Sequence, residues 1–367
     1  MANQNQAQKP SAAALYAKWR NNTRQQVVTL PSINLNQFSQ IGTIQIRPVG
    51  YLADLYVSVQ GTVTVGGTSI TGNFATYPPS PWNIIKSLRL YTNMGVEIYR
   101  VSGYGTALFN KFTKTQAELT INPVNEFNSG NNFNRVYTAL PSSVPVAQAY
   151  NVNCYFKIPI STDDWLMWGM LLMQNNQVRL NLDVQLCSQS DIQGTVAGTS
   201  LVLTPNFNVQ VHQKFYSQPA QGAPNTSWVH TVLEETLPYT ITGDIMYEPP
   251  RGQILTRLIG QLENNGAQLS GGYINSTRFQ VAETVVPYNE TYIGHLIRNF
   301  QDTKQWLPDG MIFYDLADGF GVPEIMEPRD FFNITQQTDF RHITNVSGFS
   351  PVNAQIRYIK EQLGVVQ

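Results

Sequence analysis

One stretch of this sequence occurs twice, and this internal repeat limits the folds open to the chain. Residues 85–110 and 274–299 are 189 positions apart and share seven identical residues. Each copy predicts a short apolar strand, a polar turn, a second short strand and a helical segment. A period of about half the 367-residue chain indicates two similar lobes in tandem and excludes a solenoid. The identities in the first copy are Ile85, Ser87, Arg89, Val96, Tyr99, Gly105 and Asn110.

The repeat is interpreted as a duplicated scaffold element and not as a site. We therefore expect the pairs Arg89/Arg278 and Tyr99/Tyr288 to serve core or sheet packing.

Low charge is the main feature of the composition. Charged residues make up 13% of the chain, about half of the usual share, and the net charge is −1. Asn, Gln, Ser and Thr supply the polarity instead, so few ions must be desolvated when such a surface meets another protein. This balance favours extensive protein contact and argues against a molecule built as a whole to bind nucleic acid.

Neither a signal peptide nor a membrane-spanning helix is expected. The first ten residues are polar, and the longest apolar block, 165–173, is far shorter than the roughly 20 residues of a span. We therefore expect a soluble protein made in the cytosol. Cys154 and Cys187 adjoin apolar strand patterns, which favours buried free thiols over a disulfide.

Residues 1–25 are predicted to form a basic, amphipathic helical arm. Ser11 can cap a helix over 11–25, and no acidic residue occurs before Asp54. This asymmetry favours an anionic partner, such as lipid head groups, nucleic acid or an acidic neighbour. The alternative is an ordinary docked terminal helix. The residues expected to make the contact are Lys9, Leu15, Lys18, Trp19, Arg20 and Arg24.

The rest of the chain predicts two β-rich lobes at 26–216 and 229–367, joined by a Gly- and Pro-containing linker at 217–228. Long, irregular loops favour two-sheet jelly rolls over up-and-down barrels. Alternation around Gly61 predicts two strands that turn there. Helices are expected at 161–172 and 292–300. Further strands are expected at 152–159, 178–186, 207–211, 230–240, 254–262, 311–314, 332–343 and 354–359.

Few residues suggest catalysis. Asp163 and Asp164 could form the acid/base couple of a glycosidase-like site, but adjacent carboxylates at a helix start are far more often capping groups. Glu234 and Glu235 lie in a strand and should point to opposite faces. The four histidines lack metal-ligand spacing and are expected at the surface or at interfaces: His212, His230, His295 and His342.

Four stretches together resemble a known family. They are the first repeat copy (82–112), the strand–helix–strand segment 156–184, the helix and LPDG turn at 292–310, and MIFYDLAD at 311–318. In this order they resemble the double jelly-roll major capsid proteins of tectivirus-type phages, which are tailless and carry double-stranded DNA and an internal membrane.

The resemblance implies an all-β fold of two tandem eight-stranded jelly rolls, with an N-terminal helix and short helices between strands. It implies a structural protein of the virion, synthesised in the host cytoplasm, with no catalytic, cofactor or metal site. Three subunits would form a pseudo-hexagonal capsomer of an icosahedral shell. The expected partners are neighbouring capsomers, penton and other minor capsid proteins, and anionic lipid of the internal membrane, without sequence-specific nucleic acid.

Two other hypotheses come from different classes. A carbohydrate-binding or carbohydrate-active β-sandwich would place Asp163 in a cleft, and a receptor-binding spike would form a fibrous or knob-like trimer. Two similar lobes in tandem favour the tiling protein over both.

Overall fold

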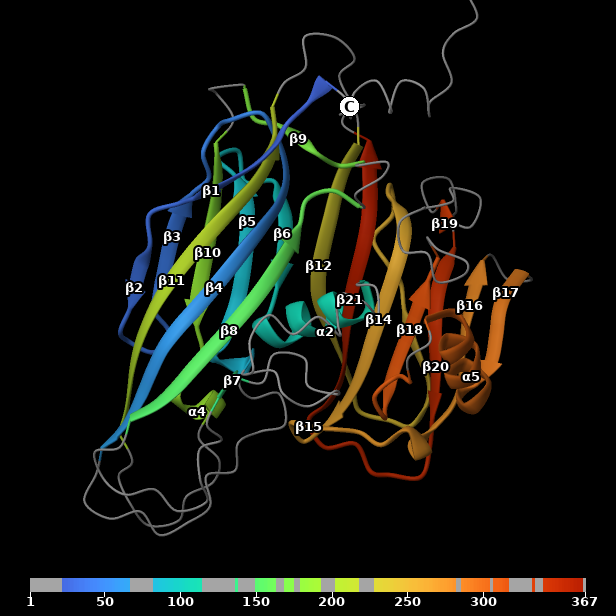
Figure 1. Ribbon diagram of the computed structural model, residues 1–367. Helices are drawn as coiled ribbons and strands as arrows, with labels where there is room; N and C mark the ends of the chain where they lie inside the picture. The colour runs from blue at the N-terminus through green and yellow to red at the C-terminus, as the bar shows by residue number, and fades with distance from the viewer. Residues whose placement is uncertain are drawn as a thin grey trace, which may run out of the picture.

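The strands form three sheets, with the first half of the chain beside the second (Figure 1). The computed structural model describes residues 22–66, 82–113, 136–137, 149–162, 168–174, 179–192, 202–217, 228–281, 285–303, 306–316, 332–333 and 339–365.

The first half contains eleven described strands and three short helical elements. The helical elements are η1 (Trp82–Ile84), α2 (Gly103–Thr113) and α4 (Gln189–Ile192). The strands are β1 (Gln25–Thr29), β2 (Ile33–Leu35), β3 (Ile41–Gln45), β4 (Tyr51–Gly66), β5 (Ile85–Thr92), β6 (Glu97–Val101), β7 (Val136–Tyr137), β8 (Ala149–Pro159), β9 (Leu171–Leu172), β10 (Leu180–Leu186) and β11 (Val202–Tyr216).

The second half contains ten described strands and two helical elements, η3 (Gly271–Tyr273) and α5 (Tyr292–Thr303). The strands are β12 (Trp228–Tyr239), β13 (Gly243–Tyr247), β14 (Ile254–Asn264), β15 (Ala267–Gln268), β16 (Ile274–Val281), β17 (Val285–Thr291), β18 (Met311–Asp315), β19 (Phe332–Asn333), β20 (Phe340–Val346) and β21 (Ala354–Val365).

Each half is a sandwich of two four-stranded sets, and the strand orders match. The sets of the first half are β3-β10-β5-β6 and β1-β11-β4-β8. Those of the second half are β13-β20-β16-β17 and β12-β21-β14-β18. Each of the eight strands in the two first-half sets thus has an equivalent at the same place in the second half. This arrangement confirms the expected fold of two eight-stranded jelly rolls.

The sequence repeat coincides with a structural repeat. η1, β5 and α2 begin 189 residues before η3, β16 and α5, respectively. β5 and β16 also share one order of buried, half-buried and exposed positions. The expected packing role fits these contacts, since Tyr99 is buried and Arg89 pairs with Glu97 at 2.6 Å across neighbouring strands.

The two halves are joined by a parallel contact between β6 and β12. Tyr99 and Arg100 lie opposite Val232 and Leu233. This contact merges one sheet from each half into a single ten-stranded sheet, which is why there are three sheets and not four. The hydrophobic core also crosses the junction, because Phe112 of α2 stacks on Phe313 of β18 with ring centroids 4.9 Å apart.

The prediction of a strand pair turning at Gly61 was wrong. β4 runs without a break through Gly61, and its neighbour β11 passes very close to it. A Cβ atom on Gly61 would lie 2.8 Å from Phe207 Cα and would collide with the carbonyl oxygen of Asn206. Close approach of two backbones, and not a turn, requires this glycine.

Two other predicted elements differ from the structure. Leu171 and Leu172 form β9, paired with β4, in place of the end of a helix over 161–172, because they continue the first-half sheet. The predicted strand over 332–343 agrees with the structure at 332–333 and 340–343, and its residues 334–338 lie outside the described residues. Thr23 and Arg24 are not helical, because Arg24 pairs with Ser217 through their backbones and leads directly into β1.

The remaining sequence predictions have mixed outcomes. The strands expected near 152, 178, 207, 230, 254, 311 and 354 are present. Cys154 and Cys187 are buried thiols that form no disulfide, as expected. Most of the linker, residues 218–227, lies outside the described residues, so the predicted boundaries of the two lobes stay a prediction.

Candidate functional site at helix α5

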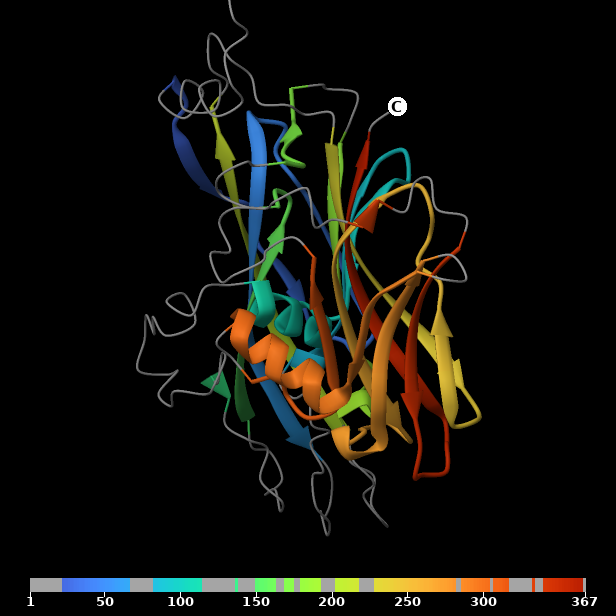
Figure 2. The same cartoon turned by 90° about the vertical axis from the view of Figure 1, so that its right-hand side faces the viewer.

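Helix α5 is the second-half copy of the repeat helix, and it starts at a capped turn. The Thr291 hydroxyl accepts a hydrogen bond from the backbone N–H of Gly294 at 3.2 Å. Its inward residues at helical spacing are Tyr292, His295 and Asn299, all of which are buried. In Figure 2, α5 is the orange helix in front of the second-half strands.

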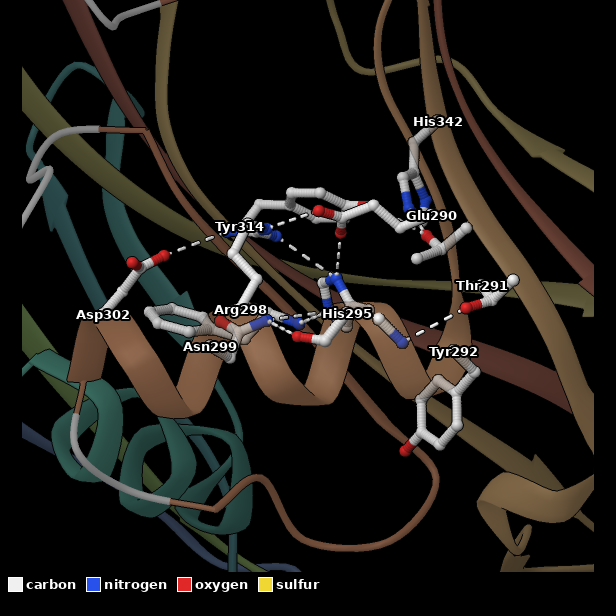
Figure 3. Close-up of polar contacts among 12 residues, drawn as sticks. Glu290, Thr291, Tyr292, His295, Arg298, Asn299, Asp302, Tyr314 and His342 are labelled. Atoms are coloured by element: carbon white, nitrogen blue, oxygen red, sulfur yellow. Dashed lines mark hydrogen bonds and ion pairs between the residues drawn. The ribbon is translucent and has the colours of Figure 1, made fainter.

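His295 anchors the inward face in a fixed orientation (Figure 3). Its Nε2 accepts the backbone N–H of Phe313 at 3.0 Å, so its Nδ1 is free to donate to Glu290 at 3.0 Å. Asn299 donates to the His295 carbonyl at 2.9 Å. Burial lowers the pKa of His295, because the charged form would lose its hydration.

The charged side chains of Arg298, Glu290 and Asp302 continue the hydrogen-bond network of His295 towards the surface. Arg298 donates to Glu290 at 2.7 Å and reaches Asp302 at 3.4 Å (Figure 3). Burial acts to raise the pKa of Glu290, but hydrogen bonds from His295 and Arg298 outweigh it and lower that pKa. The inward side of α5 therefore combines a connected polar network with apolar packing, since Leu296 packs against the core.

A second histidine continues the buried polar network in the sandwich. His342 Nε2 lies 2.9 Å from the Thr277 hydroxyl, and its Nδ1 lies 3.0 Å from the Tyr358 hydroxyl. Tyr314 donates to the same Thr277 hydroxyl at 3.0 Å. Burial, with a smaller effect of His295, lowers the pKa of His342 to about 3.

The expectation that the histidines lie at the surface or at interfaces was wrong for His230, His295 and His342, which are buried within the chain. His230 lies 2.7 Å from Glu361, whose other oxygen is 2.8 Å from Arg257. The sequence contained a signal for such positions. His342 keeps the strand alternation of buried residues, and His295 the helical spacing of Tyr292 and Asn299.

The outward face of α5 is apolar and exposed. The exposed fractions are 70% for Ile293, 47% for Ile297 and 37% for Phe300. Trp306 is 59% exposed and stacks on Phe300, with ring centroids 4.4 Å apart. A surface helix normally turns most of its apolar residues to the core, so this additional exposed apolar face is typical of a helix that meets another protein. We call Ile293, Ile297, Phe300 and Trp306 the α5 outer face.

The equivalent helix α2 has the same positions covered. Tyr104 and Leu108 stand where α5 has Ile293 and Ile297. Leu108 is buried, and the Tyr104 hydroxyl accepts a hydrogen bond from Gln261 of β14 at 3.1 Å. Tyr104 thus contacts the second half of the chain, and Leu108 belongs to a core cluster that includes Phe313 of β18, whereas Ile293 and Ile297 of α5 are exposed.

Most of the predicted site residues cannot be compared with the structure. Lys9, Leu15, Lys18, Trp19 and Arg20 of the arm lie outside the described residues, as do Asp163 and Asp164. Arg24 is described and exposed, and its backbone N–H donates to the Ser217 hydroxyl at 2.9 Å.

Glu234 and Glu235 act separately, as their strand spacing predicts. Glu234 pairs with Arg357 at 2.6 Å, whereas Glu235 pairs with Lys360 at 2.5 Å. Within the described part of the chain, no group of three His, Cys, Asp or Glu side chains could hold a metal ion. The helices described here include none that is long and apolar enough to cross a membrane.

The architecture is the double jelly roll of viral major capsid proteins. No family model and no curated protein matches the sequence. The similarity is to solved structures, at identities that establish the fold alone.

Three of these structures cover nearly the whole chain. The major capsid protein of Sulfolobus turreted icosahedral virus has a TM-score of 0.65 and 12% identity, covering 93% of this chain and 97% of its own. The major capsid protein P2 of bacteriophage PM2 has a TM-score of 0.52 and 12% identity, covering 94% and 98%. The Faustovirus major capsid protein has a TM-score of 0.55 and 10% identity, covering 100% and 93%.

Proposed function

We propose that this protein is a structural major capsid protein and not an enzyme. The observation that carries the proposal is the duplicated jelly roll, shared along more than nine-tenths of the chain with capsid proteins from several viruses. The low share of charged residues supports a surface made for close contact with other copies.

We further propose that three chains associate into a capsomer with a pseudo-hexagonal outline, and that such capsomers tile an icosahedral shell over an internal membrane. Two similar lobes in each of three subunits place six similar units around one axis. The open apolar α5 outer face supports this association, since exposed apolar patches of this kind mark protein contacts.

The same proposal gives the N-terminal arm a place at the base of the capsomer. Its basic residues would contact anionic lipid of the internal membrane or neighbouring capsomers. Penton and other minor capsid proteins complete the expected partners, and synthesis in the host cytoplasm precedes assembly. Within the described residues, no observation favours the carbohydrate-binding alternative.

The test is the mass of the purified protein in solution. Light scattering at micromolar concentration should give three times the mass of one chain. Electron micrographs of the same sample should show triangular or hexagonal particles. A stable, well-folded monomer at that concentration would contradict the proposal.

A further inference from the structure

We propose that the hairpin between β5 and β6 contacts an anionic lipid bilayer directly. Met94 and Val96 enter the head-group region, and Arg47 and Arg179 bind the lipid phosphates. The inference rests on the proposed function, because it names a part of the folded body that meets the internal membrane. This contact is separate from the N-terminal arm, which lies outside the described residues.

The end of this hairpin exposes apolar side chains. Residues 93–96, which we call the β5–β6 tip, are all exposed. The exposed fractions are 71% for Met94 and 55% for Val96. A Cβ atom on Gly95 would meet nothing within 4 Å, so the tip projects from the described part of the chain. Single exposed apolar residues need no explanation, but two at the end of a projecting hairpin indicate an apolar contact.

Hydrogen bonds hold the β5–β6 tip in one conformation. The carbonyl of Thr92 accepts the N–H of Gly95 at 2.9 Å, and its hydroxyl accepts the N–H of Val96 at 3.1 Å. The side chain of Asn93 accepts the N–H of Arg179 at 3.0 Å, and the Asn93 N–H donates to the Arg179 carbonyl at 2.8 Å. The tip is therefore preorganised, so that binding through it loses little conformational entropy.

The sequence repeat shows that this turn does not need an apolar residue at its end. The residue 189 positions after Met94 is Glu283, whereas Val96 is matched by Val285. A glutamate at this position would be repelled by anionic lipid, because both carry negative charge. Of the two copies, only the first therefore has the side chain that contact with a bilayer requires.

Positive charge lies beside the β5–β6 tip. The β3–β10 ladder, extended by two residues, places Arg47 opposite Arg179. Both arginines are exposed, and within the described residues neither forms an ion pair. Glu97, the acidic residue next to the tip, is already held by Arg89 at 2.6 Å and Arg100 at 3.1 Å. The charge of Arg47 and Arg179 is thus available to an anionic partner.

The β5–β6 tip and the start of the described chain lie at one end of the molecule. Gln213, close to the end of β11, binds the backbone of Arg47 through its side chain, at 2.9 and 3.1 Å. Arg24, directly before β1, binds Ser217, directly after β11. Figure 2 shows the cyan turn between β5 and β6 beside the C-terminal end. A bilayer that meets the N-terminal arm therefore faces the tip as well.

The pairing of apolar and basic side chains favours lipid over nucleic acid. Proteins that bind single strands use aromatic rings, on which the bases stack, beside their basic groups. Surfaces that bind at a bilayer instead combine Lys or Arg with apolar side chains that reach the acyl boundary. The β5–β6 tip has no aromatic residue. Anionic lipid is therefore the partner that the observations favour.

The first experiment measures where the β5–β6 tip lies. The full-length variant M94C, labelled with a polarity-sensitive fluorophore, is added to vesicles of phosphatidylcholine and phosphatidylglycerol. We expect a blue shift of the emission and weaker quenching by acrylamide. The matched control is I241C, because Ile241 is 74% exposed and follows the end of β12 that is distant from the C-terminus. Its emission should not change. Unchanged emission at position 94 in protein that sediments with the vesicles would overturn the inference.

The second experiment measures vesicle binding by co-sedimentation at low salt. M94D/V96D should bind at least about tenfold more weakly than the wild type. R47Q/R179Q should bind at least about fivefold more weakly. The control for charge is K86Q, because Lys86 is exposed at the opposite end of β5. It should bind like the wild type. Circular dichroism establishes that each variant is folded, and R47Q/R179Q decides the result if M94D/V96D does not fold.

The remaining outcomes are distinct. Wild-type binding to these vesicles by both double variants overturns the inference. It is also overturned if R47Q/R179Q loses affinity for a DNA fragment and none for the vesicles, since the arginines would then bind nucleic acid. Either result leaves the capsid function standing. A monomeric wild-type protein instead contradicts the proposed function itself.

Discussion

The carboxylate of Glu234 accepts a hydrogen bond from the backbone N–H of Ser102 at 2.7 Å, directly before helix α2. A side chain from the second half of the chain thereby satisfies the start of a helix in the first half. The same carboxylate holds Arg357 at 2.6 Å. A negative charge at a helix N-terminus is favourable, so this contact helps to fix the two halves against each other.

Replacing Glu234 should therefore weaken the junction. E234A leaves the Ser102 N–H and Arg357 without this partner, and we expect a loss of about 2–3 kcal/mol in the free energy of unfolding. E234Q keeps an acceptor for Ser102 and should lose less. Urea unfolding at fixed protein concentration measures the difference. The control is E248A, because Glu248 is 60% exposed and its ion pair with Arg341 should contribute little. Equal stability of E234A and E248A would contradict the capping role.

The folded protein should lose stability as the pH falls below about 6.5. The pKa of His342 is about 3 in the fold, whereas an unfolded histidine has about 6.5. Between these values the unfolded chain binds the extra proton, so its free energy falls relative to the folded state. Between pH 7 and pH 5 this one residue should cost about 2 kcal/mol. His295, whose pKa burial also lowers, adds to the loss in the same direction.

The variant H342Q separates this effect from other titrations. Carboxylates titrate mainly below pH 5 in the unfolded chain, so they change little in this window. H342Q should be less stable at pH 7 but should show a smaller loss between pH 7 and pH 5 than the wild type. Urea unfolding at the two pH values gives both quantities. An identical loss in both proteins would show that His342 is not responsible.

Gly61 should not accept even a methyl group. In G61A the added Cβ meets the backbone of β11, which cannot move without breaking its ladder with β4. We expect a cost of about 2–3 kcal/mol in the free energy of unfolding. G66A, in the same strand, is the control. Its Cβ would have only an ordinary contact of 3.5 Å with the carbonyl oxygen of Val202. Thermal or urea unfolding that ranks the two variants equally would refute the steric explanation.

The thiols of Cys154 and Cys187 should be unreactive until the protein unfolds. Burial raises the pKa values of Cys154 and Cys187 to about 12, so neither forms the reactive thiolate at neutral pH. A chromogenic disulfide reagent should detect no thiol in the native protein and both thiols after denaturation. Fast reaction of a native thiol would mean that one sheet opens readily.

The N-terminal arm should act in assembly and not in folding. Deletion of residues 1–21 leaves β1 intact, so the trimer should persist while shell closure or membrane attachment is impaired. If lysine and arginine residues of the arm contact lipid, liposome binding by the full chain should weaken as salt is added. Salt-independent binding would exclude an electrostatic role, and normal particles from the truncated protein would remove the arm from assembly altogether.

Local sequence patterns predicted the regular parts of this fold well. The repeat at 85–110 marked both copies of the strand–strand–helix unit, and alternation marked strands such as β10 and β11. The local patterns gave wrong predictions where a segment distant in the sequence determines the secondary structure. Glycine is common in turns, but Gly61 lies within a strand, and the backbone of β11 passes close to it. Leu171 and Leu172 follow a helix-like block, but β4 pairs with them.

The sequence by itself determined that two similar β-sandwiches follow one another, because the repeat and the alternation are encoded locally. Only the tertiary structure decided what each copy of the unit touches. α2 and α5 occupy equivalent places, but Leu108 is buried in a core cluster that includes Phe313 of the second half, whereas Ile297 is exposed. Burial depends on which surfaces lie nearby, and the pairing of β6 with β12 depends on residues more than 130 positions apart. No local pattern records such a contact, because it depends on how two distant segments meet in space.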